Sequence, residues 1–454
     1  MHSSNGPERT VSTTDVICLI LGLVIGAGIF KAPSIVAGHT GSVGDFLIVW
    51  ILGGLISIGG ALCYAELATS HPHAGGEYHW LSRAFGKRMA FFYGWSRSTV
   101  IITGSIAILA ITLGDYLSTI LPLGTYSSYL WAMICIVATS GLNLMGIRES
   151  TRTQNALTVL EILGILAIVY AGFSVSSVTS MQDLMARQSS TTQYGLAMVF
   201  VLLTFGGWNE VSYLSSEIKD GRRGIHRAVI WGLAAVTVLY LLVNLAYLNA
   251  LGLSGMAASS AVASDVFMLA FGRESAMVFS VIVILSCLNS LNATMIFGSR
   301  SNFAMGQDFR TFAWLGRWHG SGNPRNSLIL QMLVSLAVVG LAIITRQGFE
   351  TVVEFTAPVF WSFVLMVGLA LFILRHRQPD LHRPYRVPLY PWLPLAFVAV
   401  TAWMLWSSLI YTGLGALVGV AVLALGLLPL GWEAWRHRPD SLMASMGRGK
   451  SGDI

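Results

Sequence analysis

The sequence "LGLVIGAGIFKAP", residues 21 to 33, interrupts an apolar segment near the start of the chain with three glycines, a lysine and a proline. A glycine inside a helix costs about 1 kcal/mol relative to alanine, because it has no side chain to restrict the backbone. The pattern predicts a helix that breaks near residue 27 and resumes near Ile29. Pro33 then falls in the first turn of the resumed helix, where no internal backbone donor is lost.

The composition indicates that this broken helix lies in a membrane. Of the 454 residues, 54% are hydrophobic and 11% are charged, against roughly 25% charged in soluble domains. A helix needs about 20 apolar residues to cross a bilayer. Such segments lie near residues 15–38, 44–69, 91–121, 128–145, 154–176, 193–217, 228–250, 275–299, 327–345, 351–374, 391–412 and 414–435. We therefore predict an all-α integral membrane protein with twelve transmembrane helices.

The positive charges predict the orientation of the chain. With the N-terminus inside, 22 of the 27 Lys and Arg residues fall in cytoplasmic segments, as the positive-inside rule requires. The first fourteen residues are polar and contain one arginine, so we expect no cleavable signal peptide. The basic excess follows from this topology and gives no reason to expect a nucleic-acid partner. We expect a multi-pass protein of the cell membrane with both termini in the cytoplasm.

A second stretch, "VLLTFGGWNE" at residues 201 to 210, breaks the sixth predicted span at Gly206 and Gly207. Five spans separate the two breaks, so the broken helices cross the membrane in opposite directions. Paired breaks in two inverted halves indicate the binding site of a secondary transporter. The predicted segments are a cytoplasmic tail at 1–14, a first repeat at 15–176, a second repeat at 193–374, two further spans at 391–435 and a cytoplasmic tail at 436–454.

The backbone groups at the two breaks predict the chemistry of the ligand. Helix N-termini present partial positive charge and bind anions, and helix C-termini present partial negative charge. The predicted donors are the N–H groups of Ala27, Gly28 and Ile29, and the predicted unpaired acceptors are the carbonyls of Val24, Leu203 and Gly206. An anion-binding end beside a cation-binding end suits the zwitterionic head of a free α-amino acid.

Two other interpretations of the first break are weaker. Gly22 and Gly26 are spaced as in a close-packing motif between membrane helices. Gly26 and Gly28 also imitate the start of a dinucleotide-binding loop, but Lys31 occupies the third small position of that motif. No nucleophile–base grouping or phosphate loop is visible, so we expect neither an enzyme nor a cofactor.

A cluster of histidines in the loop "HPHAGGEYH" also suggests a metal site. His71, His73, Glu77 and His79 are residue types that bind zinc. The loop is glycine-rich and lies on the predicted cytoplasmic side, which favours a structural role in linking helices. We expect no metal at this position.

Four motifs resemble, in order and spacing, the amino acid/polyamine/organocation (APC) superfamily, and most closely bacterial relatives of the L-type amino acid transporters. They are "GAGIFKAP" (26–33), "AELATSHPHAGGEYHWLSRAFG" (65–86), "TFGGWNEVSYLSSEIKD" (204–220) and "LNATMIFGSRSNFAMGQD" (291–308). The resemblance covers essentially the whole chain. It implies the leucine-transporter fold, with a 5+5 inverted repeat plus two C-terminal helices, and transport by alternating access.

The resemblance also implies roles for single residues. It puts substrate carboxylate binding on Gly26, Ala27 and Gly28, and amine binding on the carbonyls of Val24, Leu203 and Gly206. L-type relatives usually have a bulky aromatic gate at the position of Leu203, so occlusion here is expected to fall to Phe205 or Trp208. Asn209, next to the break at Gly207, is a further candidate for hydrogen bonding to the substrate.

Two further features define the expected partners. L-type relatives use a cysteine between the third and fourth spans to hold a heavy chain, and residues 122–128, "PLGTYSS", contain none. We therefore expect no disulfide-linked heavy chain. A neutral amino acid is the expected substrate because the break residues are mostly apolar, while Glu210 leaves cationic amino acids or polyamines open.

Glu161, within the fifth predicted span, is the candidate coupling residue. At the matching position, L-type relatives commonly have a lysine that takes the place of a sodium ion in sodium-coupled members. Acids inside a membrane are costly and are functional-site candidates, and burial favours their protonated form. The hypothesis is a proton-coupled symporter, with sodium coupling, exchange and a structural pair of Glu161 with Arg97 or Lys31 as alternatives.

Overall fold

The computed structural model describes residues 12–26, 28–177, 193–215, 222–259, 261–318, 323–345, 348–412 and 416–436, and these residues form helices and connecting segments without a strand. The α-helices are α1 (Thr13–Val24), α2 (Gly28–Gly38), α3 (Val43–Ser70), α4 (Glu77–Phe85), α5 (Lys87–Ser96), α6 (Ile102–Ile120), α7 (Ser127–Met145), α8 (Ile147–Ser174), α10 (Tyr194–Thr204), α11 (Arg222–Ala258), α12 (Val262–Phe271), α13 (Ala276–Asp308), α14 (Arg325–Thr345), α15 (Gly348–Arg377), α16 (Trp392–Thr412), α17 (Ala416–Leu425) and α18 (Leu427–Arg436). The π-helical segment η1 (Arg97–Ile101) and the 3-10 segments η2 (Trp208–Leu214), η3 (Arg273–Ser275) and η4 (Arg310–Phe312) connect them.

The helices define a multi-pass membrane protein. Among the described residues, nine helices are long and apolar enough to cross a membrane, or ten if the bent pair α1 and α2 is one span. The predicted sixth span contains only the short helix α10 followed by η2, and the predicted last span is divided into α17 and α18. The all-α class is confirmed, and the count of twelve spans stays a prediction.

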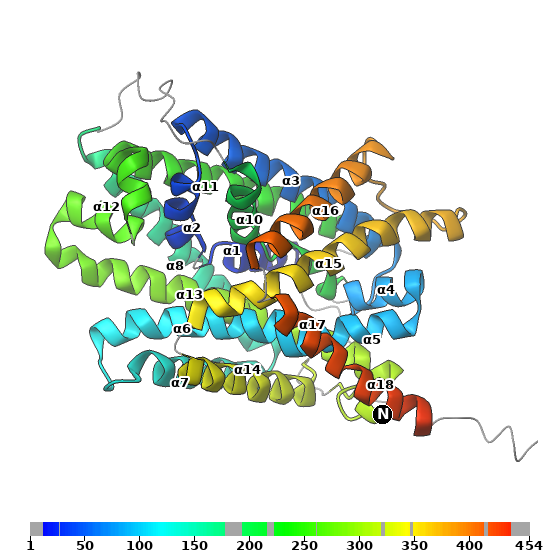
Figure 1. Cartoon of the computed structure of the whole chain (residues 1–454). Helices are drawn as coiled ribbons and strands as arrows, with labels where there is room; N and C mark the ends of the chain where they lie inside the picture. Colours follow the sequence, from blue (N-terminus) through cyan, green and yellow to red (C-terminus); the bar gives the residue numbers. More distant parts are fainter. Residues whose placement is uncertain are drawn as a thin grey trace, which may run out of the picture.

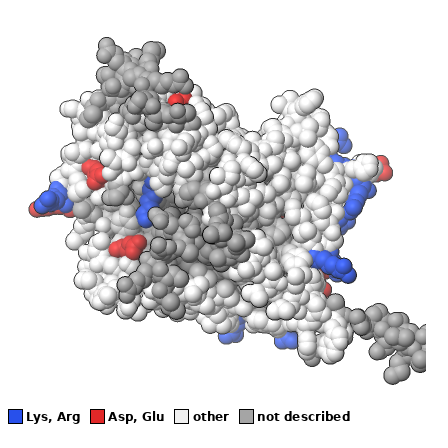
Figure 2. Space-filling model, viewed as in Figure 1, with Lys and Arg blue, Asp and Glu red and all other residues white. Residues whose placement is uncertain are grey.

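The short, interrupted helices lie at the centre of the molecule (Figure 1). α1 packs against α8, α11 and α13, while α10 packs against α2 and α3. Figure 2 shows a wide uncharged surface across the middle of the molecule, with basic side chains gathered mainly toward one end. This distribution is the one that a bilayer around the middle of the helices requires.

The first predicted break is confirmed. α1 ends at Val24 and α2 begins at Gly28, with a bend of 47° between them. The expected position of Pro33 is wrong by one turn, because α2 starts before Ile29 and Pro33 lies five residues after its first residue. A proline at this point removes the N–H that would bond to the carbonyl of Ile29.

The second predicted break is also confirmed. α10 ends at Thr204, and the chain turns through Gly206 and Gly207 before η2 begins at Trp208. Gly207 has φ +108°, a left-handed conformation that residues with a Cβ rarely adopt. The backbone of this turn therefore requires glycine at position 207, and a Cβ on Gly206 would lie 2.8 Å from the Leu203 carbonyl oxygen.

Close packing of α1 explains the glycine that precedes the first break. A Cβ on Gly22 would lie 2.3 Å from the Asn289 side-chain nitrogen and 2.4 Å from that of Gln154. A Cβ on Gly26 would lie 3.0 Å from the Ser290 hydroxyl. Gly22 is therefore a close-packing position between helices. The helix break near residue 27 is present as well, so the two interpretations apply together.

Candidate functional site

A cavity of about 270 Å³ lies between the two helix breaks. Its wall combines α1, α2, η1, α6, α10, the turn before η2, η2 itself, α13 and α15. Most of its lining is apolar, with polar groups from Lys31, Ser105, Thr204, Asn209, Glu210, Thr294 and Thr356. A mostly apolar cavity with a few polar groups is typical of a site for a small organic molecule.

Most of the residues singled out from the sequence line this cavity. They are Val24, Gly26, Gly28, Leu203, Gly206, Gly207 and Asn209. The described lining does not include Ile29, Phe205 or Trp208, and Ala27 lies outside the described residues. The cavity therefore brings the two predicted breaks together, while the expected aromatic gates point elsewhere in this conformation.

The two candidate gate residues pack away from the cavity. Phe205 is fully buried against Trp50 and Tyr240, with ring centroids 6.2 Å and 4.9 Å away. Trp208 contacts Tyr64, with ring centroids 5.0 Å apart. Each ring would have to change rotamer or move with its helix to cover the cavity.

Gly28 allows the two breaks to approach closely. A Cβ on Gly28 would lie 3.1 Å from the side chain of Thr204 and 3.2 Å from its Cα. Gly28 also begins α2, so the N–H groups of its first turn have no acceptor within the helix. The start of α2 can therefore present backbone donors and partial positive charge to the cavity.

The carbonyl groups on the other side are already partly hydrogen-bonded. The Val24 carbonyl accepts from the N–H of Gly26 at 2.9 Å and from the hydroxyl of Tyr240 at 2.6 Å. The Leu203 carbonyl accepts from the N–H of Gly206 at 3.0 Å. The expectation that these two carbonyls are unpaired is wrong, because the chain bends back at each break and because Tyr240 of α11 reaches the first one.

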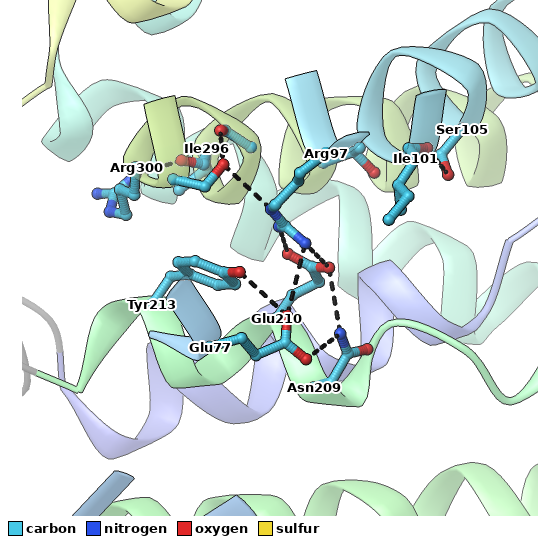
Figure 3. A network of polar contacts seen from close by, with 12 residues as sticks. Glu77, Arg97, Ile101, Ser105, Asn209, Glu210, Tyr213, Ile296 and Arg300 are labelled. Atoms are coloured by element: carbon cyan, nitrogen blue, oxygen red, sulfur yellow. Dashed lines mark hydrogen bonds and ion pairs between the residues drawn. The ribbon is translucent and has the colours of Figure 1, made fainter. Parts of the chain in front are cut away.

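A buried ionic network lies next to the cavity (Figure 3). The Arg97 guanidinium of η1 bonds both carboxylate oxygens of Glu210, with one N–O distance of 3.0 Å. Arg97 also lies 3.7 Å from the Glu77 carboxylate. The side chains of Arg97, Glu210 and Glu77 are 2%, 8% and 3% exposed, respectively. Glu210 therefore lines the cavity with its charge compensated by Arg97, whereas the sequence left open that it contacts a cationic substrate.

Neutral side chains complete the network around Glu77. Its carboxylate accepts hydrogen bonds from the Tyr213 hydroxyl at 3.0 Å and from the Asn209 amide at 3.2 Å. The Tyr93 hydroxyl contacts the same carboxylate. Because Asn209 also lines the cavity, the network connects the cavity wall to the start of α4 (Figure 3).

Glu161 lies outside this ionic network. Its side chain is fully buried and accepts a hydrogen bond from the Asn289 amide at 2.7 Å and another from the Ser286 hydroxyl. The alternative pairing of Glu161 with Arg97 is not formed, because Arg97 bonds Glu210. Glu161 is also not among the described residues that line the cavity.

The histidine loop has a structural arrangement. The rings of His73 and His79 stack with centroids 4.3 Å apart, and His71 bonds Gln378 at 2.9 Å. Burial, reinforced by the neighbouring His73, lowers the pKa of His79 to about 3. No group of three potential metal ligands occurs in the part of the chain that the structure describes.

Sequence reasoning did not assign three residues to the site, although it named Arg97 and Lys31 as possible partners of Glu161. Arg97 is a charged residue within an apolar span, and that alone is a signal for function. Lys31 follows Gly28 by three residues, a spacing that puts both on one face of α2. Tyr240 gave no local signal, because its contact with Val24 joins residues 216 positions apart.

These features define a class: a helical multi-pass membrane protein with a cavity for a small solute at two helix breaks. A family model described as "Amino acid permease" matches residues 11–424, and the chain belongs to this family. The resemblance to APC superfamily permeases is thereby confirmed.

Individual relatives align along most of the chain. Asc-type amino acid transporter 1 of Mus musculus is 28% identical over 450 residues, which cover 95% of this chain and 82% of that protein. The b(0,+)-type amino acid transporter 1 of Mus musculus is 26% identical, covering 89% and 83%. Large neutral amino acids transporter small subunit 2 of Homo sapiens is 28% identical, covering 95% and 82%.

The ionic network predicts a large effect of one substitution. Arg97→Ala leaves Glu210 and Glu77 buried without their cation, and breaking a buried pair from one side costs about 3–5 kcal/mol. We expect a clear fall in the melting temperature of the purified protein in detergent. Lys87→Ala is the control, because Lys87 pairs with Asp308 at 2.8 Å on the surface, 67% exposed, where such pairs contribute about 0–1 kcal/mol. Equal melting temperatures for the two variants would contradict a stabilising role for the buried network.

Proposed function

We propose that this protein is a secondary active transporter that moves α-amino acids across the membrane by alternating access. The observation that carries the proposal is the cavity between two helix breaks, with the start of α2 on one side and the α10 turn on the other. Membership of the amino acid permease family and the names of three relatives support the same substrate class.

The proposed binding mode uses backbone groups for the head of the substrate. The substrate carboxylate lies against Gly26, whose own N–H bonds the Val24 carbonyl, and bonds to the N–H groups at Ala27, Gly28 and Ile29. The ammonium group lies near the carbonyls at Leu203 and Gly206. The Val24 carbonyl joins them only when Tyr240 turns its hydroxyl to the Thr204 carbonyl, 3.1 Å away. Asn209 and Gly207 lie at the same end of the site, and either Phe205 or Trp208 closes the site in the occluded state.

The proposed architecture follows from the pairing of the breaks. Two inverted repeats of five spans, at 15–176 and 193–374, each begin with a broken helix, and two further spans follow. The protein lies in the cell membrane with both termini in the cytoplasm and works without a disulfide-linked heavy chain. Neutral amino acids are the proposed substrates, because Arg97 compensates the charge of Glu210 and most of the cavity lining is apolar.

The transport proposal predicts counterflow. In proteoliposomes that contain the purified protein, unlabelled substrate inside is expected to accelerate the uptake of labelled substrate, because a carrier returns faster when loaded. A panel of labelled amino acids identifies the substrate. Single-channel currents without counterflow would instead make the protein a channel and overturn the proposal.

The binding mode predicts a specific effect at one glycine. Gly28→Leu fills the space between the two breaks, where even a Cβ lies 3.1 Å from Thr204, and we expect a loss of substrate binding of at least about tenfold. Gly38→Leu is the matched control, because Gly38 ends the same helix and a Cβ there meets nothing within 4 Å. Equilibrium binding of labelled substrate in detergent measures both. Unchanged affinity in Gly28→Leu would refute the proposed site.

We propose that transport is coupled to protons through Glu161. Its carboxyl group is fully buried, and the described groups that bond it, Ser286 and Asn289, are neutral. A buried acid in neutral surroundings is the kind of group that can take up and release a proton during a transport cycle. Alternating hydration of the neighbouring cavity then gives a proton a route on and off. Sodium coupling and obligatory exchange are the alternatives. Accumulation driven by a sodium gradient in the same proteoliposome assay would indicate sodium coupling.

Coupling through Glu161 predicts a separation of two activities. Glu161→Gln keeps the size of the side chain and resembles the protonated acid, so it is expected to retain counterflow and to lose accumulation driven by a pH gradient. Proteoliposome uptake with and without the gradient measures both. If the variant still concentrates substrate when only protons can drive it, Glu161 is not the coupling residue.

A further inference from the structure

One face of α2 forms the part of the cavity wall that lies beyond the first break. Gly28, Lys31, Ala32 and Ile35 all line the cavity, and their spacing of three, four and seven residues puts them on one face of the helix. Among the described lining residues, Lys31 and Glu210 are charged, and Lys31 is the only cation. The cavity therefore has a lysine one turn beyond the helix start that is proposed to bind the substrate carboxylate.

The geometry of a helix directs the Lys31 side chain toward the break. The Cα–Cβ bonds of a helix tilt toward its N-terminus, so a long side chain covers the turn that precedes its own Cα. For Lys31 that turn begins at Gly28. Lys31 is partly buried, as expected for a lysine whose stem lies along a wall while its ammonium group stays hydrated. The ammonium group is therefore presented on the side of the cavity where the substrate is proposed to lie.

The acid on the cavity wall does not offset this charge. Arg97 bonds both carboxylate oxygens of Glu210, so this acid is already compensated. Glu77, the second acid of the ionic network, lies 3.7 Å from Arg97 and is not among the described residues that line the cavity. A cationic side chain in the cavity would thus meet Lys31 without an unengaged carboxylate among the described lining residues.

The neutral hydroxyl groups of the wall do not discriminate by charge. The hydroxyls of Ser105, Thr204 and Thr294 donate to backbone carbonyls one turn earlier in the chain, at 2.9, 2.8 and 2.7 Å. Their oxygens can still accept from any donor, whether it is an ammonium group, an amide or a hydroxyl. Discrimination between charged and uncharged side chains therefore falls to Lys31.

We infer that Lys31 is a specificity-determining residue that excludes cationic amino acids and admits those with neutral or anionic side chains. Two like charges about 6 Å apart, at an effective dielectric constant of about 20, repel strongly enough to weaken binding about a hundredfold. Water in the cavity screens part of this repulsion, which leaves an expected effect of at least about tenfold. Repulsion of the wrong ligand is a common source of specificity. This selection rests on the proposed amino acid site and adds the group that chooses among substrates.

A purely structural role for Lys31 would have different consequences. Its charge also acts on Cys287 of α13, and a lysine that only held helices together would change the binding of all ligands alike when replaced. An electrostatic filter instead changes the binding of cations and anions in opposite directions. The two roles are therefore separated by ligands that differ mainly in charge.

The test measures competition against a labelled neutral amino acid bound to the purified protein in detergent. Two pairs of competitors are similar in length and differ in charge: L-lysine with L-norleucine, and L-glutamate with L-glutamine. The cavity of about 270 Å³ has room for side chains of this size. In the wild type, lysine is expected to bind at least about tenfold more weakly than norleucine. Lys31→Met removes the charge from a long side chain, and it is expected to bring lysine close to norleucine and to weaken glutamate relative to glutamine.

Three further variants complete the series. Lys31→Arg retains a positive charge and is expected to keep both affinity ratios, whereas Lys31→Glu is expected to make lysine bind more tightly than norleucine. Lys87→Met is the matched control, because Lys87 lies on the surface and pairs with Asp308, and it is expected to leave both ratios unchanged.

The outcomes distinguish the role of Lys31 from the proposed function. Lysine that binds the wild type as tightly as norleucine, or affinity ratios that stay the same in Lys31→Met, would overturn the role of Lys31. A common loss of affinity for all four competitors in Lys31→Met would indicate a structural role and would overturn it as well. If no amino acid binds the wild type and counterflow is absent, the proposed transport function itself fails.

Discussion

The structure depends on one constraint: a backbone polar group in a membrane needs a hydrogen-bonding partner. An unpaired group in hydrocarbon costs several kcal/mol, so a helix can break there only where protein or water supplies the missing bonds. At the end of α1, the Tyr240 hydroxyl donates to the Val24 carbonyl. The Ser286 hydroxyl donates to the Ile25 carbonyl, and the Ser290 hydroxyl donates to the Gly22 carbonyl. The breaks are therefore possible because α11 and α13 carry hydroxyl groups at these positions.

The same constraint explains why the cavity lies where it does. Breaking two helices at one level leaves the start of α2 and the turn after α10 facing a common space. The glycines then let the two backbones approach, since a Cβ on Gly28 would press against Thr204. Partial charges on backbone groups can thus bind a small polar solute in an otherwise apolar site, and no uncompensated ionic side chain is needed in the membrane.

The charged residues near the cavity divide into two systems with different physics. Arg97 forms ion pairs with Glu210 and Glu77. These contacts join η1 to η2 and to the start of α4. Glu161 is surrounded by neutral donors, so its charge has no fixed counterion among the contacts described. A group of the first kind stabilises one arrangement of helices, whereas a group of the second kind can change its charge during a cycle.

The sequence by itself determined the all-α membrane class, the two breaks and the residues that form them. In a bilayer, an apolar segment of this length can satisfy its backbone hydrogen bonds only as a helix. Glycine pairs within such segments are local signals of a helix break. The tertiary structure decided which groups meet at those breaks. That Arg97 pairs with Glu210, that Tyr240 bonds Val24, and that Ser286 joins Glu161 to Ile25 depends on helix rotation and packing, which bring together residues 113, 216, 125 and 261 positions apart. Local patterns in the chain do not encode such contacts, because each helix face offers several partners and only the packed assembly selects among them.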